Sequence, residues 1–347
     1  MKTSKLPELG KINREFFDRV IYPQLGAANE DIVIGPWHGV DYGVLRLGDR
    51  YLAISTDPFF IVPQYGFSRA AWFGFHIIMS DVAVSGLEPK YLAIDLNLPP
   101  EISEEQLEEM WKAVHLESQK CGISVITGHT ARYTGCNYPM VGGATGIAVG
   151  DEHDLRGPHR VKLGDHIVVT KGPAVETTGL LAVTFPQKFV EAGGTDFQRE
   201  AENIFYHMSV LDDCAVAREF PGVHVMHDAT EYGLWGGLFE MAQAGKFGMN
   251  IYHANIPFQP VIQKTAELFA FDPFSAISEG TLILTVDPKE SSDLVKAFEE
   301  KGILSSIIGE VIPEPKGLKI QRDGAEQTLE FPNVDPYWIL AAELSKQ

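Results

Sequence analysis

The sequence predicts a mixed α/β protein of two domains. Three observations support this fold class: the length, an alternation of extended and helical apolar patterns, and a polar stretch near the middle. The chain has 347 residues, of which 45% are hydrophobic and 22% charged, as in ordinary globular proteins with sizeable cores. Because residues 151–165 contain few apolar side chains, we expect a boundary there, with domains over residues 1–155 and 156–347.

The first part of the chain alternates extended and helical patterns. Residues 12–24 have helical apolar spacing, and residues 31–35 form an extended run. Leucine and isoleucine then alternate about Gly48-Asp49, which predicts a β-hairpin followed by the loop TDPFF. Residues 68–84 are apolar almost all round, which is typical of a helix packed on several sides.

A capped amphipathic helix and three strands complete the first half. Ser103 and Gln106 form a capping box, and the apolar face that follows them ends at Gly122. The strands are expected at residues 91–98, 123–128 and 140–150.

The second half repeats the alternation of apolar strand and helix. This order predicts another α/β unit. The expected strands are residues 166–170, 223–228, 281–286 and 305–312, and the expected helices follow Gly172 and occupy residues 234–245 and 291–301.

The charge excludes one class of partner. Lys and Arg number 28 against 47 Asp and Glu, so the net charge is −19, which repels a phosphate backbone and makes nucleic acid an unfavourable partner. A ligand that carries phosphates would need local neutralisation, by metal ions on clustered carboxylates or by a few placed cations. The search for a site therefore starts from the acidic residues.

Cysteine usage and hydropathy predict a cytoplasmic protein. Cys121, Cys136 and Cys214 are odd in number and show no CxxC spacing, so neither a zinc knuckle nor a disulfide framework is indicated. The amino terminus lacks the apolar core of a signal peptide, and no stretch approaches the ~18 apolar residues of a membrane span. We expect no membrane association.

Asp41 and Asp57 flank the predicted hairpin at equal distances. Asp41 lies eight residues before Asp49 and Asp57 lies eight residues after it, so antiparallel pairing brings both carboxylates to the same open end. Two neighbouring carboxylates either share a proton or bind a cation, because their repulsion disfavours both being ionised alone. The alternative is that both are solvated turn aspartates.

Asp81 lies within the apolar helical pattern HIIMSDVAV. A buried carboxylate there needs a cation or hydrogen-bond donors; alternatively, Asp81 lies near the helix end and faces water or accepts backbone hydrogen bonds. Mg²⁺ joining Asp41, Asp57 and Asp81, with waters and ATP phosphates as further ligands, is the hypothesis that these three residues support together.

Polar residues also follow an apolar strand in the first half. Thr127, Gly128, His129 and Thr130 come at the expected end of the strand ISVI, where the glycine permits close approach of a ligand. His129 is placed to hydrogen-bond a phosphate or a substrate oxygen. The alternative is a loop histidine bonded to backbone.

The second half offers two further candidates. Asp228 and Glu231 have capping-box spacing at a helix start, and such an amino terminus can cradle an anion, although capping alone explains them equally well. Lys171 is either a cation for a phosphate or an exposed lysine. No GxxxxGK loop, HExxH motif or GxSxG elbow is present.

Taken together, these segments resemble the aminoimidazole ribonucleotide (AIR) synthetase superfamily, with the hydrogenase-maturation protein HypE, thiamine-monophosphate kinase and selenophosphate synthetase. Within it the chain is most similar to HypE-like AIR synthase-related proteins, through KLPELGKI and LGAANEDIVIGP. The other matching segments are GVDYGVLRLGDRYLAISTDPFF (39–60), SDVAVSGLEP (80–89), ITGHTA (126–131), VTKGPAVETTGLLA (169–182) and MHDATEYGLWGGLFEMA (226–242).

The resemblance implies a fold and an activity. The amino-terminal domain would form a β-barrel across a homodimer, and the carboxy-terminal α/β domain would cover a nucleotide cleft. The activity would be ATP- and Mg²⁺-dependent phosphoryl transfer that activates an oxygen-bearing small molecule or an acyl or carbamoyl substrate. Its residues would be Asp41, Asp57 and Asp81 for metal, Asp57, Thr127, Gly128, Thr130, Asp228 and Thr230 for nucleotide, and His129 and Lys171 for catalysis.

Departures from the family pattern leave the phosphoryl acceptor open. Val40 and Tyr42 flank Asp41 where many relatives have an acidic pair. His129 replaces the acidic residue of kinase-like and hydrogenase-maturation relatives, although selenophosphate synthetases also have GHT. The chain ends LAAELSKQ, without the terminal cysteine of HypE, and lacks the amino-terminal cysteine segment of selenophosphate synthetases. The alternatives are a nucleotide-binding maturation or regulatory protein without turnover, working with a maturation partner, and a thiamine-monophosphate kinase.

Overall fold

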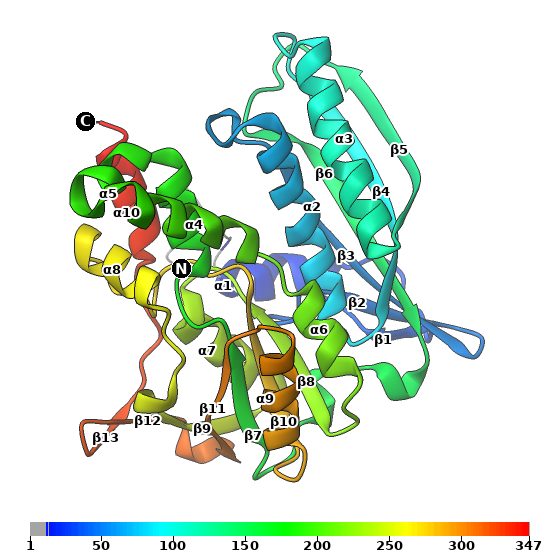
Figure 1. Cartoon of the computed structure of the whole chain (residues 1–347). Coiled ribbons are helices and arrows are strands. Elements are labelled where there is room, and N and C mark those ends of the chain that lie inside the picture. The colour runs from blue at the N-terminus through cyan, green and yellow to red at the C-terminus, as the bar shows by residue number, and fades with distance from the viewer. Residues whose placement is uncertain (1–11, 13, 347) are drawn as a thin grey trace.

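The computed structural model describes residue 12 and residues 14–346, and it contains two sheets with helices packed against them (Figure 1). Most of the segment KLPELGKI and the predicted start of the first helix lie outside the described residues. The rest of that helix is present as α1 (Arg14–Phe16), which continues through a π turn to Ile21 and a 3-10 turn to Gln24. The helical spacing of residues 14–24 is therefore confirmed.

The first sheet has the strand order β1-β2-β3-β6-β4-β5. Neighbouring strands are antiparallel except for β4 and β5, which are parallel. The bounds are β1 (Ile32–Ile34), β2 (Gly43–Leu47), β3 (Arg50–Phe60), β4 (Glu88–Leu98), β5 (Ser124–Arg132) and β6 (Met140–Gly150).

Two loop predictions in this sheet are wrong. The segment TDPFF belongs to β3, because its backbone continues to pair with β6 as far as Phe60. The segment GHT lies inside β5, which pairs with β4 through Arg132. In both places the ladder to a neighbouring strand holds polar residues in an extended conformation that their composition alone does not predict.

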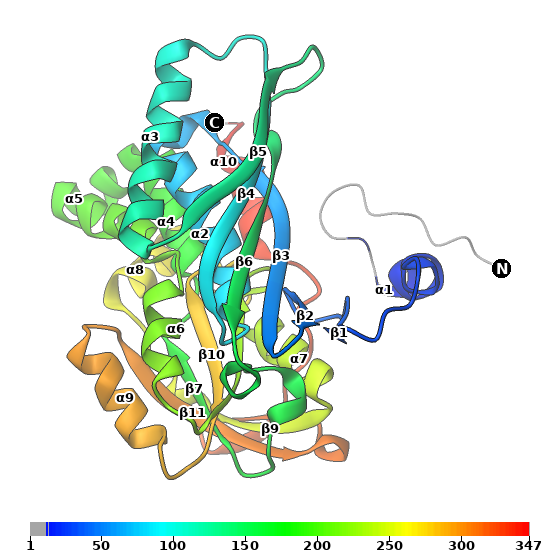
Figure 2. The same ribbon diagram turned by 90° about the vertical axis from the view of Figure 1, so that its right-hand side faces the viewer.

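Two helices cover one face of the first sheet, and Figure 2 shows α1 on the opposite side, standing apart from the strands. They are α2 (Phe67–Ala83) and α3 (Glu104–Cys121). The capping box of Ser103 and Gln106 is present, and Gly122 ends α3 in the left-handed conformation with φ 68°. The sequence predicted both helices correctly.

The second sheet has the order β13-β12-β9-β11-β7-β10-β8. Its pairs are antiparallel except for β9 and β12. The bounds are β7 (His166–Thr170), β8 (Val223–Ala229), β9 (Phe247–Tyr252), β10 (Thr281–Val286), β11 (Ser305–Pro313), β12 (Leu318–Arg322) and β13 (Ala325–Thr328).

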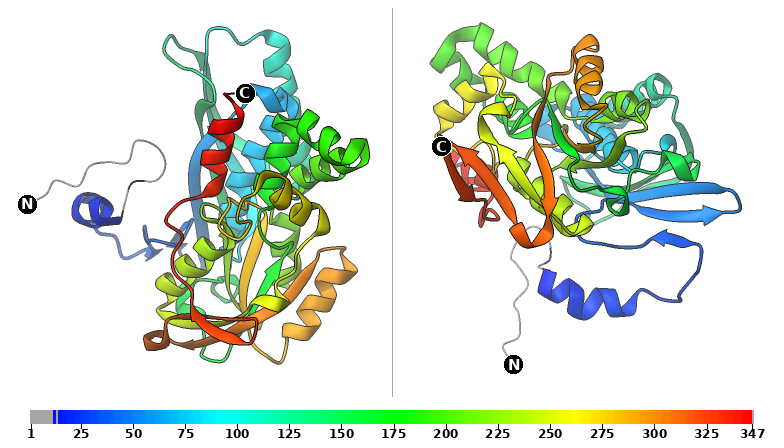
Figure 3. Two further views of the ribbon diagram at one scale, coloured as in Figure 1. Left: turned by 90° about the vertical axis from the view of Figure 1, so that its left-hand side faces the viewer. Right: turned by 90° about the horizontal axis from the view of Figure 1, so that it is seen from below.

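The helices of the second half pack on this sheet and on α2. Tyr337 and Leu344 of the last helix join a core cluster with Phe73 of α2, so the chain end returns to the first half, as Figure 3 shows. The helices are α4 (Val175–Thr184), α5 (Pro186–Asn203), α6 (Leu211–Arg218), α7 (Gly233–Gly245), α8 (Pro260–Phe269), α9 (Ser291–Glu300) and α10 (Pro336–Leu344).

The largest buried apolar cluster spans both halves. Val82 from α2 packs in one cluster with Cys214 and Ala217 from α6 and with Met226 from β8. The fold therefore fixes α2 against α6 and β8, and the strand ends of the second sheet against the helix that carries Asp81. Within the described residues, no helix is long and apolar enough to cross a membrane.

Candidate functional site

Asp81 lies within electrostatic range of two other carboxylates from the first half, Asp41 and Asp57. Asp81 lies on the buried side of α2, with 8% of its surface exposed, and accepts a hydrogen bond from Ser55 Oγ at 3.1 Å. Burial, together with the charges of Asp41 and Asp57, raises the pKa of Asp81 well above its ordinary value. Asp41, Asp57 and Asp81 therefore lie within electrostatic range of one another, and their joint binding of a metal ion stays a prediction.

The hairpin explains the approach of Asp41 to Asp57. Its register pairs Gly43 with Ile54 and Leu47 with Arg50, so residue 41 falls opposite residue 56. The prediction of a shared open end is correct, while the register differs by one residue from the symmetric count. Ser55 is buried on the helix-covered side, and the two-residue period of the strand directs Asp57 to the same side.

Two acids from the second half complete the group. Asp228 is the penultimate residue of β8 and is fully buried, and Glu279 precedes β10 with 2% of its surface exposed. Burial and the charge of Asp41 raise the pKa of Asp228 to about 6, against the hydrogen bond to Glu279, which lowers it. Burial and the charge of Asp228 raise the pKa of Glu279 well above its ordinary value. We call Asp41, Asp57, Asp81, Asp228 and Glu279 the acidic ring.

His227 is the cation beside this ring. Its Nδ1 lies 3.2 Å from Asp41 Oδ2, and its Nε2 lies 3.2 Å from Glu240 Oε2. Burial alone would lower the pKa of His227, but the charges of Asp41 and Glu240 outweigh it and raise that pKa to about 10. The imidazole is therefore protonated at neutral pH and ties the segment before β2 to β8.

Unsatisfied oxygens in the acidic ring fit a divalent cation. Within the described part of the chain, no N–H or hydroxyl group donates to Asp228 Oδ1, Asp228 Oδ2 or Glu279 Oε1, although all three are buried, and the hydrogen bond between Asp228 and Glu279 needs a proton on one of the two acids. Buried carboxylate oxygens of this kind are stabilised by a metal ion or by protonation. Hard oxygen ligands are the type that Mg²⁺ selects.

The ring is wider than a preformed metal cluster. Among the described residues, the only three or more His, Cys, Asp or Glu with ligand atoms all within 4.8 Å are Asp151, His153 and Asp154. That surface group lies in a short 3-10 turn, where Asp154 accepts a hydrogen bond from the Asp151 backbone N–H at 3.0 Å. A cation in the acidic ring would therefore need additional ligands such as water or phosphate oxygens.

The segment Thr127–Thr130 lies away from the acidic ring within one chain. Asp57 pairs with Ala144, Ala144 with Ile94 and Ile94 with Gly128, a separation of three strands, or about 14 Å at about 4.8 Å per strand. His129 is exposed on the edge strand β5, and its Nε2 lies 2.8 Å from Tyr133 Oη. The alternative of a loop histidine bonded to backbone is therefore wrong, since the partner is a tyrosine side chain.

Asp228 and Glu231 do not cap a helix. Asp228 belongs to β8, whereas α7 begins at Gly233 after Tyr232, and no side chain caps it. Thr230 lies in the turn between them, and its hydroxyl donates to Glu231 Oε2 at 2.9 Å. The predicted anion cradle at a capped helix start is therefore corrected: strand β8 presents Asp228 to the acidic ring.

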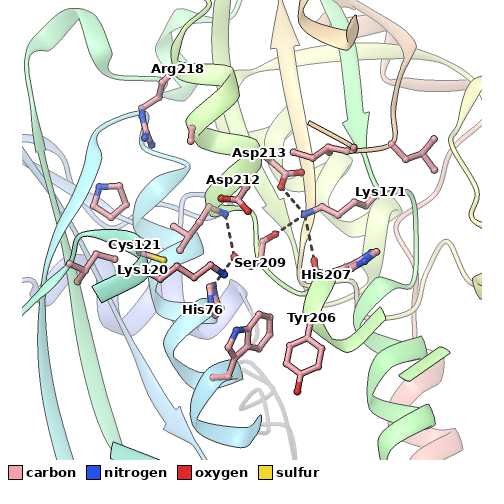
Figure 4. Close-up of a pocket in the computed structure, with 18 of the residues that line it drawn as sticks. His76, Lys120, Cys121, Lys171, Tyr206, His207, Ser209, Asp212, Asp213 and Arg218 are labelled. Carbon is pink, nitrogen blue, oxygen red and sulfur yellow. Dashed lines mark hydrogen bonds and ion pairs between the residues drawn. The ribbon is translucent and has the colours of Figure 1, made fainter. Parts of the chain in front are cut away.

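Lys171 is buried and paired rather than exposed. Its Nζ lies 2.8 Å from Asp213 Oδ2 and donates to the Ser209 carbonyl oxygen at 2.6 Å. It follows β7 and borders a cavity of about 400 Å³ between the two halves (Figure 4). The Lys171 charge also lowers the pKa of Asp228, so the lysine lies within electrostatic range of the acidic ring.

Sequence reasoning missed Glu279, His227 and Glu240. Glu279 lies in a turn between Ser278 and Gly280, and His227 lies in a strand whose residues are all buried. Neither carries a spacing signal, because their partners come from elements far apart in the sequence. The adjacent pair His227-Asp228 inside an apolar strand was the one available indication of a buried polar site.

Two family models match the chain. Residues 39–148 match the model described as AIR synthase related protein, N-terminal domain, and residues 162–320 match the model described as AIR synthase related protein, C-terminal domain. Both matches contain residues of the acidic ring.

Curated relatives align over most of the chain. A Methanocaldococcus jannaschii protein that carries a hydrogenase expression/formation name is 24% identical over 333 residues, covering 94% of this chain and 96% of its own. The carbamoyl dehydratase HypE of Escherichia coli is 26% identical over 303 residues, covering 83% and 84%.

Solved structures share the fold. A HypE structure in complex with ATP aligns with a TM-score of 0.64 at 19% identity, covering 93% of each chain. A HypE–HypF complex aligns with a TM-score of 0.68 at 17% identity, covering 91% of this chain and 99% of the other. The structure described as AaThiL complexed with AMPPCP and TMP aligns with a TM-score of 0.72 at 17% identity, covering 95% and 98%.

Proposed function

The chain belongs to the AIR synthase related family, and we propose that it is an ATP- and Mg²⁺-dependent phosphoryl-transfer enzyme of the HypE-like type. The observation that carries the proposal is the acidic ring, in which acids from both halves lie within electrostatic range of one another and leave buried oxygens with no N–H or hydroxyl donor. Relatives named as carbamoyl dehydratase and a HypE structure with ATP support the same reading.

Within the acidic ring, Asp57, Asp81, Asp228 and Glu279 would hold Mg²⁺. Asp41 is ion-paired with His227, so we assign it a supporting role: it keeps β8 and the hairpin together and contributes negative charge to the cation. When bound, Mg²⁺ neutralises phosphate charge and polarises the transferring phosphoryl group. The chain's own contribution is to fix these carboxylates from two domains around one point.

The second half would supply a cation and a hydroxyl. Lys171, which lies within electrostatic range of Asp228, would stabilise negative charge on the phosphates. Thr230 lies two residues after Asp228 on the same chain segment, and its hydroxyl would turn from Glu231 Oε2 to donate to the nucleotide.

We infer that Thr127, Gly128, His129 and Thr130 serve the nucleotide site in a homodimer. Within one chain Gly128 is about 14 Å from Asp57 by strand count, too far for both to contact one phosphate. The open face and edge of the first sheet carry exposed apolar residues that a second copy would cover. These include Tyr91, Val125, Ile126 and Met140, which are 40%, 37%, 53% and 50% exposed.

The proposed substrate is a small molecule with an oxygen-bearing acyl or carbamoyl group. ATP would phosphorylate that oxygen and turn it into a leaving group. The support is the carbamoyl dehydratase name of one relative and the HypF complex of another, which also favours a protein partner that presents the substrate.

The test is ADP release, measured as burst and steady state with purified protein, Mg²⁺ and ATP. We expect carbamoyl or acyl phosphoryl acceptors to raise the steady-state rate, and Asp57→Asn to abolish that rise. Tight ATP binding without ADP release under any condition would contradict the proposed enzymatic activity. It would favour a nucleotide-binding maturation protein without turnover. Stimulation by thiamine monophosphate alone would identify the kinase alternative.

A further inference from the structure

A carboxylate, an imidazole and a serine hydroxyl lie in line beside the interdomain cavity. His76 Nε2 lies 3.1 Å from Glu117 Oε2, and His76 Nδ1 lies 2.8 Å from Ser209 Oγ. Figure 4 shows His76 from α2 and Ser209 from the segment before α6. Glu117 comes from α3, so both domains contribute. None of the three belongs to the acidic ring.

The hydrogen bonds that link Glu117, His76 and Ser209 run in the direction expected for a nucleophile activated by a base. The Glu117 carboxylate accepts the proton on Nε2, which leaves the lone pair of Nδ1 to accept the Ser209 hydroxyl proton. Burial lowers the pKa of His76 despite the opposing charge of Glu117, so the imidazole is neutral and able to act as a base near neutral pH.

Two contacts fix Ser209. The Lys171 ammonium donates to its carbonyl oxygen at 2.6 Å, and the Leu211 N–H donates to its Oγ at 3.3 Å. Ser209 borders the cavity of about 400 Å³, so a substrate there can reach the hydroxyl. The Leu211 N–H contact holds Oγ as an acceptor while its proton points to His76.

The cavity lining indicates the type of substrate. Trp72 and Tyr206 line it with their rings 5.1 Å apart in an edge arrangement, and Lys120 and Arg218 also line it. The aromatic rings suit a planar apolar group, and Arg218 suits a carboxylate or phosphate, whereas Lys120 Nζ lies 3.6 Å from Glu117 Oε2.

We propose that Ser209, His76 and Glu117 form a second active site that hydrolyses small aromatic esters carrying an anionic group. Ser209 Oγ would bond to the acyl carbon as its proton passes to His76 Nδ1, and the alcohol would leave with that proton. Water would then attack the acyl group, give a proton to His76 and release the acid as Ser209 regains its hydrogen. No other reactant is needed, and the proposal does not depend on the ATP site.

A second histidine–serine pair provides an internal comparison. His166 Nδ1 lies 2.8 Å from Ser291 Oγ, the same separation as in the first pair. Ser291 is 0% exposed and its hydroxyl donates to the Pro288 carbonyl oxygen at 3.2 Å. The hydroxyl proton is therefore engaged elsewhere, and no substrate can reach it.

The test is labelling of the wild-type protein with an aryl fluorophosphonate, followed by mass-spectrometric assignment of the modified residue. We expect Ser209 to be modified and Ser291 to remain unmodified. The rate should rise with pH as His76 loses its proton; the groups that face this imidazole are Glu117, Lys120, Asp212 and the Cys121 thiol. Absence of modification at Ser209 in folded protein would overturn the proposal.

Variants separate catalysis from a purely structural role. His76→Gln should slow labelling of Ser209 by about 100-fold or more, and Ser209→Ala should abolish hydrolysis of an anionic aryl ester. Ser291→Ala is the matched control and should hydrolyse the ester at the wild-type rate. Equal ester hydrolysis by folded Ser209→Ala and wild type would also overturn the proposal, whereas ADP release bears only on the ATP site.

Discussion

Replacing Asp228 by asparagine should stabilise the protein in the absence of a divalent cation. Asp228 is fully buried and its pKa is raised from 3.8 to about 6, so ionising it in the folded state costs about 3 kcal/mol at about 1.36 kcal/mol per pH unit. A raised acid pKa makes this cost absent below the unfolded value and complete above the folded one. Asparagine is nearly isosteric, carries no charge and can donate to Glu279.

Thermal unfolding in a chelator, followed by circular dichroism from about pH 4 to about pH 8, measures the effect. For a chain of this size, about 3 kcal/mol corresponds to a Tm increase of about 6 °C at the upper end of that range. At the lower end the variant and the wild type should unfold together.

A bound divalent cation should reverse the effect of the Asp228→Asn substitution on thermal stability. With Mg²⁺ and ATP the wild type should gain more stability than Asp228→Asn. Only the carboxylate can ligate the metal ion, and this ligation offsets the free-energy cost of burying its charge. Asp196→Asn is the control, since the Asp196 side chain is 96% exposed and its replacement should change neither result. A variant that melts below the wild type in chelator at about pH 8 would refute the assignment of Asp228 to a cation site.

Three further substitutions test other parts of the site. Asp57→Asn should weaken Mg-ATP binding by about tenfold or more with little change in Tm, measured by calorimetry with and without Mg²⁺. His227→Gln should destabilise by about 3–5 kcal/mol because Asp41 and Glu240 lose a buried cation; since the pKa of His227 is raised to about 10, urea unfolding should show this loss shrinking as pH rises through that value. His129→Ala should lower the rate of ADP release and leave the Tm nearly unchanged. A lower Tm with a normal rate of ADP release would show that the residue has a structural role.

Local patterns predicted the elements that hold the site. The capping box of Ser103 gave the start of α3 and the apolar run gave α2, because both signals come from neighbouring residues. The spacing of Asp41 and Asp57 about a two-residue turn gave their shared hairpin end. Asp81 was predicted as a site residue because a buried carboxylate within an apolar helix needs a partner, whichever element the helix packs against.

The rest depends on contacts between distant segments. Glu279 joins Asp228 only because β10 pairs with β8, with Leu282 opposite Asp228. His227 meets Asp41 only because the residue before β2 packs against a strand of the other domain. Asp228 and Glu231 matched a capping pattern, but the ladder to β10 keeps Asp228 extended, so a tertiary contact outweighed a local preference.

Burying the acids of the acidic ring costs folding free energy. A protein with a net charge of −19 buries Asp81, Asp228 and Glu279 where neighbouring acids raise their pKa values. Its cation His227 forms an ion pair with Asp41 rather than with Asp228 or Glu279. Packing alone would favour apolar residues at such positions. Local rules are broken in this way mainly at functional sites. Because the acids come from both domains, a cation bound to them must also stabilise the junction of α2 and β8, so metal binding is expected to raise the stability of both halves together.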